Sequence, residues 1–354
     1  MQHWTLRSFS SGCRSGSSCP VHERTVRNDT HGTRGDQHDR EPLHRHRDEP
    51  RGGGGSTMSA LLRGIVAYPI TPFTSTGRVD EVLLGKIVDD MVKAGVHAIA
   101  PLGSTGVLPY LSDDEREQVA EIVIKRVAGR VPTLVGVSSL TTERTVHHAK
   151  HAEKLGASAV MIIPMSYWKL SDAEIITHYE TVAKRIAIPI AVYNNPATGG
   201  LDLSPDVISR LLKIPNVTMV KGSTGDVNRM HRLVQLCGED VAFYNGSNPL
   251  ALAAFVAGAR GWCTAAPHII PKLNIELYDA IQRGDVAAAR QSFYRQLPFL
   301  QFIVAHGLPR AISAALELQG TSVGPLRAPL QALPAERVEE LRRILVGLEV
   351  IPGE

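Results

Sequence analysis

The sequence of 354 residues lacks any long apolar run, and no window approaches 18 uninterrupted apolar residues. A transmembrane helix needs about 20 predominantly apolar residues, so a membrane-spanning helix is not expected. The sequence also lacks an excess of charge, because 38 Lys and Arg face 35 Asp and Glu and the formal net charge is +3. So small an imbalance gives no electrostatic basis for binding nucleic acid or an anionic membrane surface. We therefore expect a small molecule as the partner.

Cysteine is scarce, with four residues in the whole chain and only Cys237 and Cys263 after residue 57. Such sparse cysteine excludes a disulfide framework and suits a reducing compartment, so we expect the protein in the cytoplasm. Hydrophobic residues nevertheless make up 43% of the chain, which is enough for a globular core.

The first 57 residues differ in composition from the rest. They hold 6 of the 14 His, 9 Arg, no Lys and 7 acidic residues, and they close with a run of four glycines. A segment with so few apolar residues cannot offset the entropy lost on ordering, so it is expected to be disordered. The remaining part has 29 basic and 28 acidic residues and is nearly neutral.

This N-terminal segment has three interpretations. It contains four potential zinc ligands, Cys13, Cys19, His22 and His31. However, five residues separate the two cysteines, whereas structural zinc sites begin with ligands about two to four residues apart. Residues 1–20 lack acidic side chains, as transit peptides do, but they also lack the apolar residues of an amphipathic presequence. We favour the third interpretation, an upstream extension before a working chain that starts at Met58.

From Arg63 onward, short β-branched runs alternate with longer stretches of helical period. The pattern predicts eight strands, at 65–68, 98–102, 133–137, 159–163, 190–193, 217–221, 241–244 and 261–264. The spacing leaves room for one helix between each pair of strands, which means that neighbouring strands pair in parallel.

Helix signals fall between these strands. Two Ser-x-x-Glu capping boxes, at 112–115 and 171–174, predict helix starts. Ser204-Pro205 and Asn248-Pro249 each place a capping residue before a proline that suits the first helical position.

Eight such units in roughly 220 residues favour a (β/α)8 TIM barrel, an α/β fold, over a doubly wound open sheet. No Gly-x-Gly-x-x-Gly follows an early strand, which further disfavours dinucleotide binding. Residues 271–352 contain more helix than one barrel unit needs, so we expect about three appended helices. The expected domains are a disordered extension at 1–57, the barrel at 58–284 and a C-terminal helical region at 285–354.

The reactive groups of a TIM barrel come from the C-terminal ends of its strands. The sixth expected strand ends in Lys221, the fifth ends in Tyr193, and the second leads into Gly103-Ser104-Thr105-Gly106. Burial disfavours the ammonium form of a lysine, and a neutral amine attacks a carbonyl to form a Schiff base. Tyr193 is placed to relay protons, and the hydroxyls and N–H groups of the turn are placed to hold a carboxylate. The pattern predicts a site for a 2-oxo acid.

These motifs, with Thr71-Pro72-Phe73 before them, resemble the dihydrodipicolinate synthase and N-acetylneuraminate lyase family of class I aldolases, over residues 61 to about 348. The resemblance implies that Lys221 is the Schiff-base lysine and Tyr193 the proton-relaying tyrosine. It implies substrate contacts from Ser104 and Thr105, with Ser104 acting as the catalytic hydroxyl, and a pocket-lining role for Gly246. It also implies a homotetramer that needs no organic cofactor or metal.

The chain departs from the family pattern at several positions. Many members have Glu after the Gly-x-Thr-Gly turn and after the lysine, where this chain has Val107 and Gly222. The lysine-biosynthesis enzymes carry an Arg that clamps a carboxylate, and this chain has Thr198 there, which cannot make a bidentate contact. The aromatic residue that those enzymes lend to a neighbouring subunit aligns with Ser166 or Tyr167.

We therefore predict a lyase that forms a Schiff base with pyruvate or another 2-oxo acid and acts on a catabolic sugar acid or hydroxylated oxo acid. Three alternatives stay open. They are 4-hydroxy-tetrahydrodipicolinate (dihydrodipicolinate) synthase, a dehydratase or deaminase that uses the same imine, and a barrel that binds a metabolite without turning it over.

Overall fold

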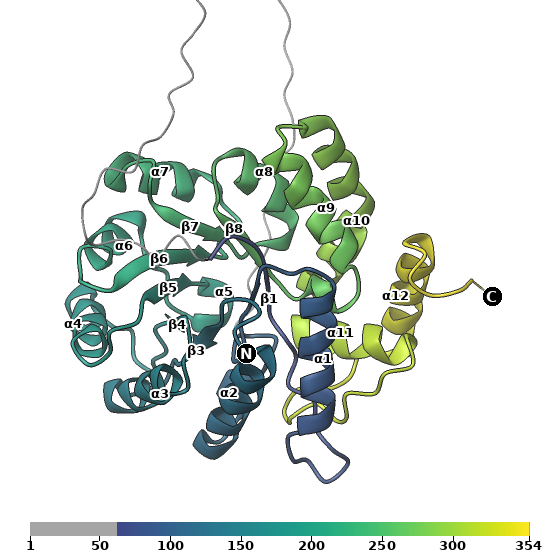
Figure 1. Ribbon diagram of the computed structural model, residues 1–354, viewed down its shortest axis with the longest axis horizontal. Helices are drawn as coiled ribbons and strands as arrows, with labels where there is room; N and C mark the ends of the chain where they lie inside the picture. Colours follow the sequence, from purple (N-terminus) through teal and green to yellow (C-terminus); the bar gives the residue numbers. More distant parts are fainter. Residues whose placement is uncertain (1–61, 354) are drawn as a thin grey trace, which may run out of the picture. The chain divides into compact units, whose positions relative to one another are not determined.

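The computed structural model describes residues 62–353, so the expectations for residues 1–57, including the zinc ligands, and for a start at Met58 lie outside the described residues. Eight strands form the centre of the fold and helices surround them (Figure 1). The strands are β1 (Gly64–Ala67), β2 (Ala98–Ile99), β3 (Leu134–Gly136), β4 (Ala159–Ile162), β5 (Ile190–Asn194), β6 (Val217–Gly222), β7 (Ala242–Asn245) and β8 (Gly261–Thr264).

The strands pair in the order β2-β1-β8-β7-β6-β5-β4-β3, and every pairing is parallel. A parallel bridge between Ile99 and Thr133 joins the two edge strands, β2 and β3, so the sheet is nearly closed. This is the predicted TIM barrel, and the open doubly wound sheet is excluded. Because all strands run in the same direction, their C-terminal ends meet at one end of the barrel.

Seven of the strands lie within one residue of their predicted bounds, but β2 ends three residues early. The prediction extended it to Leu102, which has a φ of +60°. An extended strand has a strongly negative φ, so the chain must leave the strand before this residue. The turn 103–106 follows directly.

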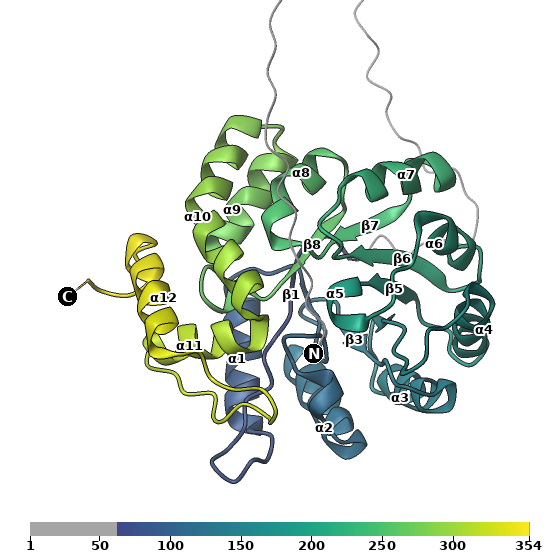
Figure 2. The same cartoon turned by 180° about the vertical axis from the view of Figure 1, so that it is seen from behind.

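Nine helices lie between or directly after the strands of the described barrel, and three more follow them. The first set is α1 (Glu81–Lys93), α2 (Asp113–Val127), α3 (Thr142–Lys154), α4 (Asp172–Ala183), α5 (Pro196–Gly199), α6 (Pro205–Leu211), α7 (Asn228–Cys237), α8 (Ala251–Val256) and α9 (Pro271–Gln282). Short 3-10 helices lie at η1 (Leu108–Tyr110), η2 (Asn248–Leu250) and η3 (Ala266–His268). The appended helices are α10 (Val286–His306), α11 (Leu308–Leu318) and α12 (Ala335–Gly347), and Figure 2 shows them beside α1 and α9.

Three of the four predicted helix starts are confirmed. Ser112 and Ser171 form complete capping boxes with their glutamates, and the Ser204 side chain accepts the N–H of Val207 at the start of α6. The fourth was wrong, because Asn248 lies inside η2 and caps nothing. Its side-chain oxygen instead accepts the indole N–H of Trp262 at 3.1 Å, so it is not available to the helix backbone.

Two apolar cores hold the barrel together. Outward-facing strand residues pack against the helices in one large cluster, while the inward-facing residues fill the barrel interior. The interior set alternates along each strand, as in the pairs Val66 and Tyr68, Ala191 and Tyr193, and Ala242 and Tyr244. Lys221 follows Met219 in the same alternation on β6, so its side chain points into the barrel.

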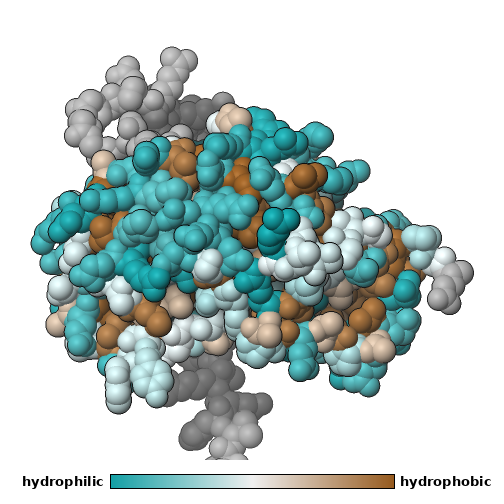
Figure 3. All heavy atoms as spheres, turned by 90° about the horizontal axis from the view of Figure 1, so that it is seen from below, coloured by the Kyte–Doolittle hydropathy of each residue, from teal (hydrophilic) through white to brown (hydrophobic). Residues whose placement is uncertain are grey.

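The helices expose their polar sides, and hydrophilic residues dominate the middle of the face in Figure 3. Within residues 62–353, none of the helices has the length and apolar character required to cross a membrane.

Candidate active site

Lys221 lies at the C-terminal end of β6 and is only 5% exposed. Its Nζ is 3.8 Å from the centre of the Tyr193 ring and 3.9 Å from the centre of the Tyr68 ring. Tyr193 is the direct partner of Lys221 in the pairing of β5 with β6, whereas Tyr68 follows β1 on another part of the barrel wall. The amine is therefore held between two aromatic faces inside the barrel mouth.

The Tyr193 hydroxyl is the centre of a polar cluster. Burial alone would raise the pKa of Tyr193. The charge of Lys221, the hydroxyls of Ser104 and Ser223 and the amide of Asn195 lower it, and together they outweigh the effect of burial. As a result, the pKa of Tyr193 is lowered from its ordinary value. Two predicted site residues, Tyr193 and Ser104, thus meet beside Lys221.

The turn 103–106 follows β2 and lies against β1. Gly103 fits there because a Cβ would come within 2.4 Å of the Tyr68 ring, and the Thr71 hydroxyl donates to the Gly106 carbonyl at 2.8 Å. Thr105 is buried in this turn, at 2% exposure. Val107, directly after it, has a φ of +51°, which is strained for a β-branched residue. The local backbone is therefore fixed by close packing and not by regular secondary structure.

Gly246 is next to the lysine. A Cβ at this position would lie 2.9 Å from Lys221 Cε and 2.0 Å from Ser223 Oγ. Its backbone N–H donates to the Gly222 carbonyl at 2.7 Å, which holds the loop after β7 against β6. Only glycine leaves room here for both neighbouring side chains.

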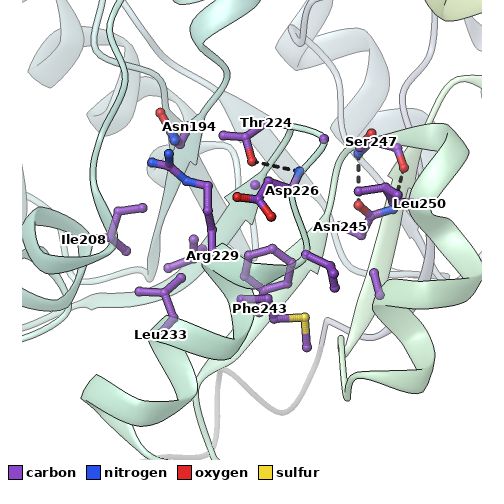
Figure 4. A pocket seen from close by; sticks show the side chains of 16 residues that line it. Asn194, Ile208, Thr224, Asp226, Arg229, Leu233, Phe243, Asn245, Ser247 and Leu250 are labelled. Carbon is purple, nitrogen blue, oxygen red and sulfur yellow. Dashed lines mark hydrogen bonds between the residues drawn. The ribbon is translucent and has the colours of Figure 1, made fainter. Parts of the chain in front are cut away.

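The position after the lysine faces the helices and not the barrel interior. A Cβ on Gly222 would come within 2.8 Å of the Phe243 ring, so that ring takes the space of a side chain. Gly222 and Phe243 line a small pocket behind β6, which Figure 4 shows with Asn194 and Arg229 at its rim. The departure from glutamate therefore changes the wall behind the lysine.

The other departures follow β4 and β5, at the C-terminal ends of these strands. Thr198 is exposed in α5, directly after β5. Tyr167 and Trp168 follow β4, are 90% and 77% exposed, and have ring centres 5.5 Å apart. Ser166 beside them is only partly exposed.

Sequence reasoning missed three residues of this cluster: Tyr68, Asn195 and Ser223. Burial, with a further effect from Cys263, raises the pKa of Tyr68 well above its ordinary value, so Tyr68 is a neutral phenol. Asn195 Nδ2 donates to the Tyr193 hydroxyl at 2.8 Å. A signal was present for two of them, because Asn195 and Ser223 lie two residues beyond Tyr193 and Lys221 on the same strand faces.

Potential metal ligands gather elsewhere among the described residues. Glu117, His147 and His148, on α2 and α3, have ligand atoms within 4.8 Å of one another. His147 Nε2 is 2.6 Å from Glu117 Oε1, which is the geometry of an ion pair or hydrogen bond. These side chains belong to the helix layer and are not among the residues around Lys221 and the Tyr193 hydroxyl.

The family model for the dihydrodipicolinate synthetase family matches residues 61–347. The chain belongs to this family. Its members are class I aldolases and lyases that act on small molecules such as pyruvate, so the chain is an enzyme of the lyase type. The match covers the whole described barrel and reaches to the end of α12.

Several relatives support the same assignment. The 4-hydroxy-tetrahydrodipicolinate synthase of Methanospirillum hungatei is 33% identical over 288 residues, which cover 80% of this chain and 99% of that protein. A putative dihydrodipicolinate synthetase structure from Pseudomonas aeruginosa is 53% identical with a TM-score of 0.80, covering 81% of this chain and 99% of that one. YagE from Escherichia coli K12, solved in complex with pyruvate, is 28% identical with a TM-score of 0.77, covering 82% and 99%.

Proposed function

We propose that the protein forms a Schiff base between Lys221 and pyruvate or another 2-oxo acid, and that it acts as a lyase on a catabolic sugar acid or hydroxylated oxo acid. The observation that carries this proposal is the position of Lys221, a buried amine between the rings of Tyr68 and Tyr193 at the C-terminal end of β6. A lysine with only a structural role would reach solvent or pair with a carboxylate.

The chemistry follows from this arrangement. Lys221 Nζ attacks the 2-oxo carbon, water leaves, and the iminium that forms withdraws electrons from the neighbouring carbon. A C–C or C–H bond at that carbon then breaks, and its electron pair forms the enamine while the iminium π pair returns to nitrogen. Tyr193 exchanges the proton. The hydroxyls of Ser104 and Thr105 hold the carboxylate.

The preference for a sugar acid rests on Thr198. An exposed threonine replaces the arginine that would clamp the carboxylate of aspartate semialdehyde in a bidentate contact. Sugar acids and hydroxylated oxo acids carry hydroxyl groups instead, and these suit the hydroxyl and amide side chains around Tyr193. The second candidate is 4-hydroxy-tetrahydrodipicolinate synthase, because a relative at 33% identity carries that name.

Trapping with borohydride tests the proposal. The protein is incubated with pyruvate, reduced, digested and examined for a mass adduct on Lys221, with Lys213→Met as a control that keeps the adduct. If no 2-oxo acid gives an adduct on Lys221, the proposal is wrong. Aldehyde release from sugar acids is then compared with consumption of aspartate semialdehyde. We expect release to dominate, and strong semialdehyde consumption would favour the synthase.

We also propose a homotetramer. Tyr167 and Trp168 form an exposed aromatic pair at the mouth of the barrel, and exposed aromatic clusters of this kind are typical of protein interfaces. Light scattering after size exclusion should give four times the chain mass. Replacing both aromatics with serine should shift the mass to smaller species, whereas a monomer in the unaltered protein would contradict the assembly.

A further inference from the structure

Asn195 and Ser223 form a second inward-facing row of polar side chains, two residues beyond Tyr193 and Lys221 along the chain. Tyr193 and Lys221 pair across β5 and β6, and the chain continues in register because Ser223 N–H donates to the Asn194 carbonyl at 2.9 Å. Side chains alternate along a strand, so Asn195 and Ser223 face the same side as Tyr193 and Lys221.

Asn195 acts on the oxygen of Tyr193. Its side-chain N–H donates to the phenol oxygen at 2.8 Å, and both residues come from the end of the same strand. A donor at this oxygen stabilises negative charge on it far more than it stabilises the neutral phenol. A hydrophobic residue of similar size would fill the space without this effect.

The hydroxyl of Ser223, near Lys221, has no hydrogen-bond acceptor within residues 62–353. Its Oγ is buried and has no hydrogen-bond partner of good geometry among the described residues. It also lies close to Lys221 Cε, because both atoms crowd the point where a Cβ of Gly246 would be. A buried hydroxyl without an acceptor costs free energy, so it is more readily explained if an acceptor forms during the reaction.

We propose that Asn195 and Ser223 are positioning residues that stabilise the deprotonated Tyr193 oxygen, so that Tyr193 removes a proton from the Lys221-bound intermediate. This inference rests on the proposed function. In the step, a C–H bond beside the iminium breaks, its electron pair forms the enamine double bond, the π pair returns to nitrogen and the proton goes to Tyr193 Oη.

The other titratable groups around Tyr193 fit this role. Lys221 on β6 favours the phenolate through its charge, and Tyr68 after β1 is a neutral phenol whose own pKa is raised by burial, by Cys263 and by the charge of Tyr193. Cys263 on β8 contacts Tyr68, and Tyr179 on α4 approaches only the backbone of Tyr193. Within the described residues, Asn195 donates to this oxygen, and the hydroxyls of Ser104 and Ser223 are the other uncharged groups that lower the pKa of Tyr193.

Two variants test the inference, Asn195→Val and Ser223→Ala. The measurements are borohydride trapping of the Lys221 adduct and the rate at which the methyl protons of pyruvate exchange with D2O, recorded against pH. We expect trapping to stay at the wild-type level while exchange near neutral pH falls about tenfold for each variant, since each loses one hydrogen bond to a charged group. The pH profile should move to higher pH. Ser223→Thr keeps the hydroxyl and should restore both the exchange rate and the pH profile. Ser247→Ala is the matched control and should leave both unchanged.

Exchange rates and a pH profile equal to the wild type in both variants would overturn the inference. Failure of the proposed function has a different signature, because the wild type would then give no adduct. In that case the Tyr193 signal in 13C-tyrosine NMR, assigned with Tyr193→Phe, reports its titration directly. Asn195→Val and Ser223→Ala should raise the titration midpoint, and an unchanged midpoint would contradict the inference.

Discussion

The amine of Lys221 lies 3.8 Å from the centre of the Tyr193 ring, over its face and not at its hydroxyl. The two residues pair directly across β5 and β6, so the distance is fixed by the strand register and not by a flexible loop. Consequently the ring contacts the amine while the hydroxyl reaches further toward Ser104 and Asn195. One side chain can thus pack against the nucleophile and exchange protons with the substrate attached to it.

This geometry predicts that Tyr193→Phe separates binding from turnover. The ring and its contact with Lys221 remain, so borohydride trapping of pyruvate should persist. The proton-exchanging group is lost, so turnover should fall by about a hundredfold or more, as is typical when a general acid–base residue is removed. Single-turnover trapping and steady-state rates on the same preparation measure the two effects, and a parallel loss of both would contradict the assignment.

Gly246→Ala should block the site without unfolding the protein. The added methyl would overlap Ser223 Oγ and crowd Lys221 Cε, so the lysine must leave its position. We expect adduct formation to fall at least about tenfold, with a small change in Tm, because the neighbouring atoms are ends of side chains. Gly347→Ala is the control, since a Cβ there meets nothing within 4 Å. Equal trapping by both variants would show that the crowding is harmless.

Restoring the glutamate that many family members have after the lysine should destabilise this chain. In Gly222→Glu the new side chain meets Phe243, and overpacking of this kind costs about 2 kcal/mol in the free energy of unfolding. Combining it with Phe243→Leu should recover about 1 kcal/mol of this loss in a double-mutant cycle measured by urea denaturation. Additive losses would mean that Phe243 does not determine the residue at position 222.

Local patterns were enough to predict the barrel and the position of Lys221 at the end of a strand. The strands are short, mostly apolar runs with turn residues around them, and the order of the elements follows from their spacing. Lys221 is visible in the sequence because it ends an apolar strand. β2 was predicted too long because the left-handed conformation of Leu102 is imposed by packing at the barrel mouth and has no signal in a hydrophobic run.

The rest of the site depends on contacts between distant segments. Tyr68 meets Lys221 only because the barrel closes β1 onto β8, and nothing near Tyr68 in the sequence indicates this. The sequence Asn248-Pro249 is typical of a helix start, but the side chain of Asn248 instead accepts a hydrogen bond from Trp262, a residue distant in the sequence. Asn195 and Ser223 resemble ordinary turn residues until the register of β5 and β6 places them on one face.

The buried ring of His268 should make the free energy of unfolding depend on pH in the acid range. It is a residue of η3 whose Nε2 accepts the N–H of Ile70 at 3.0 Å while Nδ1 lies 2.7 Å from the Ala265 carbonyl, so the neutral ring ties the loop after β1 to the loop after β8. Burial, opposed by the hydrogen bond to Ala265, lowers its pKa from 6.5 to about 4. The folded pKa is thus below the unfolded one.

The stabilisation from His268 is therefore fully present above about pH 6.5. It is lost as the pH falls toward 4, because in this range His268 is protonated in the unfolded chain and still neutral in the folded one. We expect a loss of about 3 kcal/mol over this window. In His268→Gln the amide bonds both backbone groups and has no proton to bind, so stability at pH 7 should fall slightly while the decrease between pH 6.5 and 4 becomes smaller. Urea denaturation at several pH values measures this, with the exposed His231→Gln as control. If both variants lose the same stability in acid as the wild type, the acid sensitivity of the fold comes from other groups.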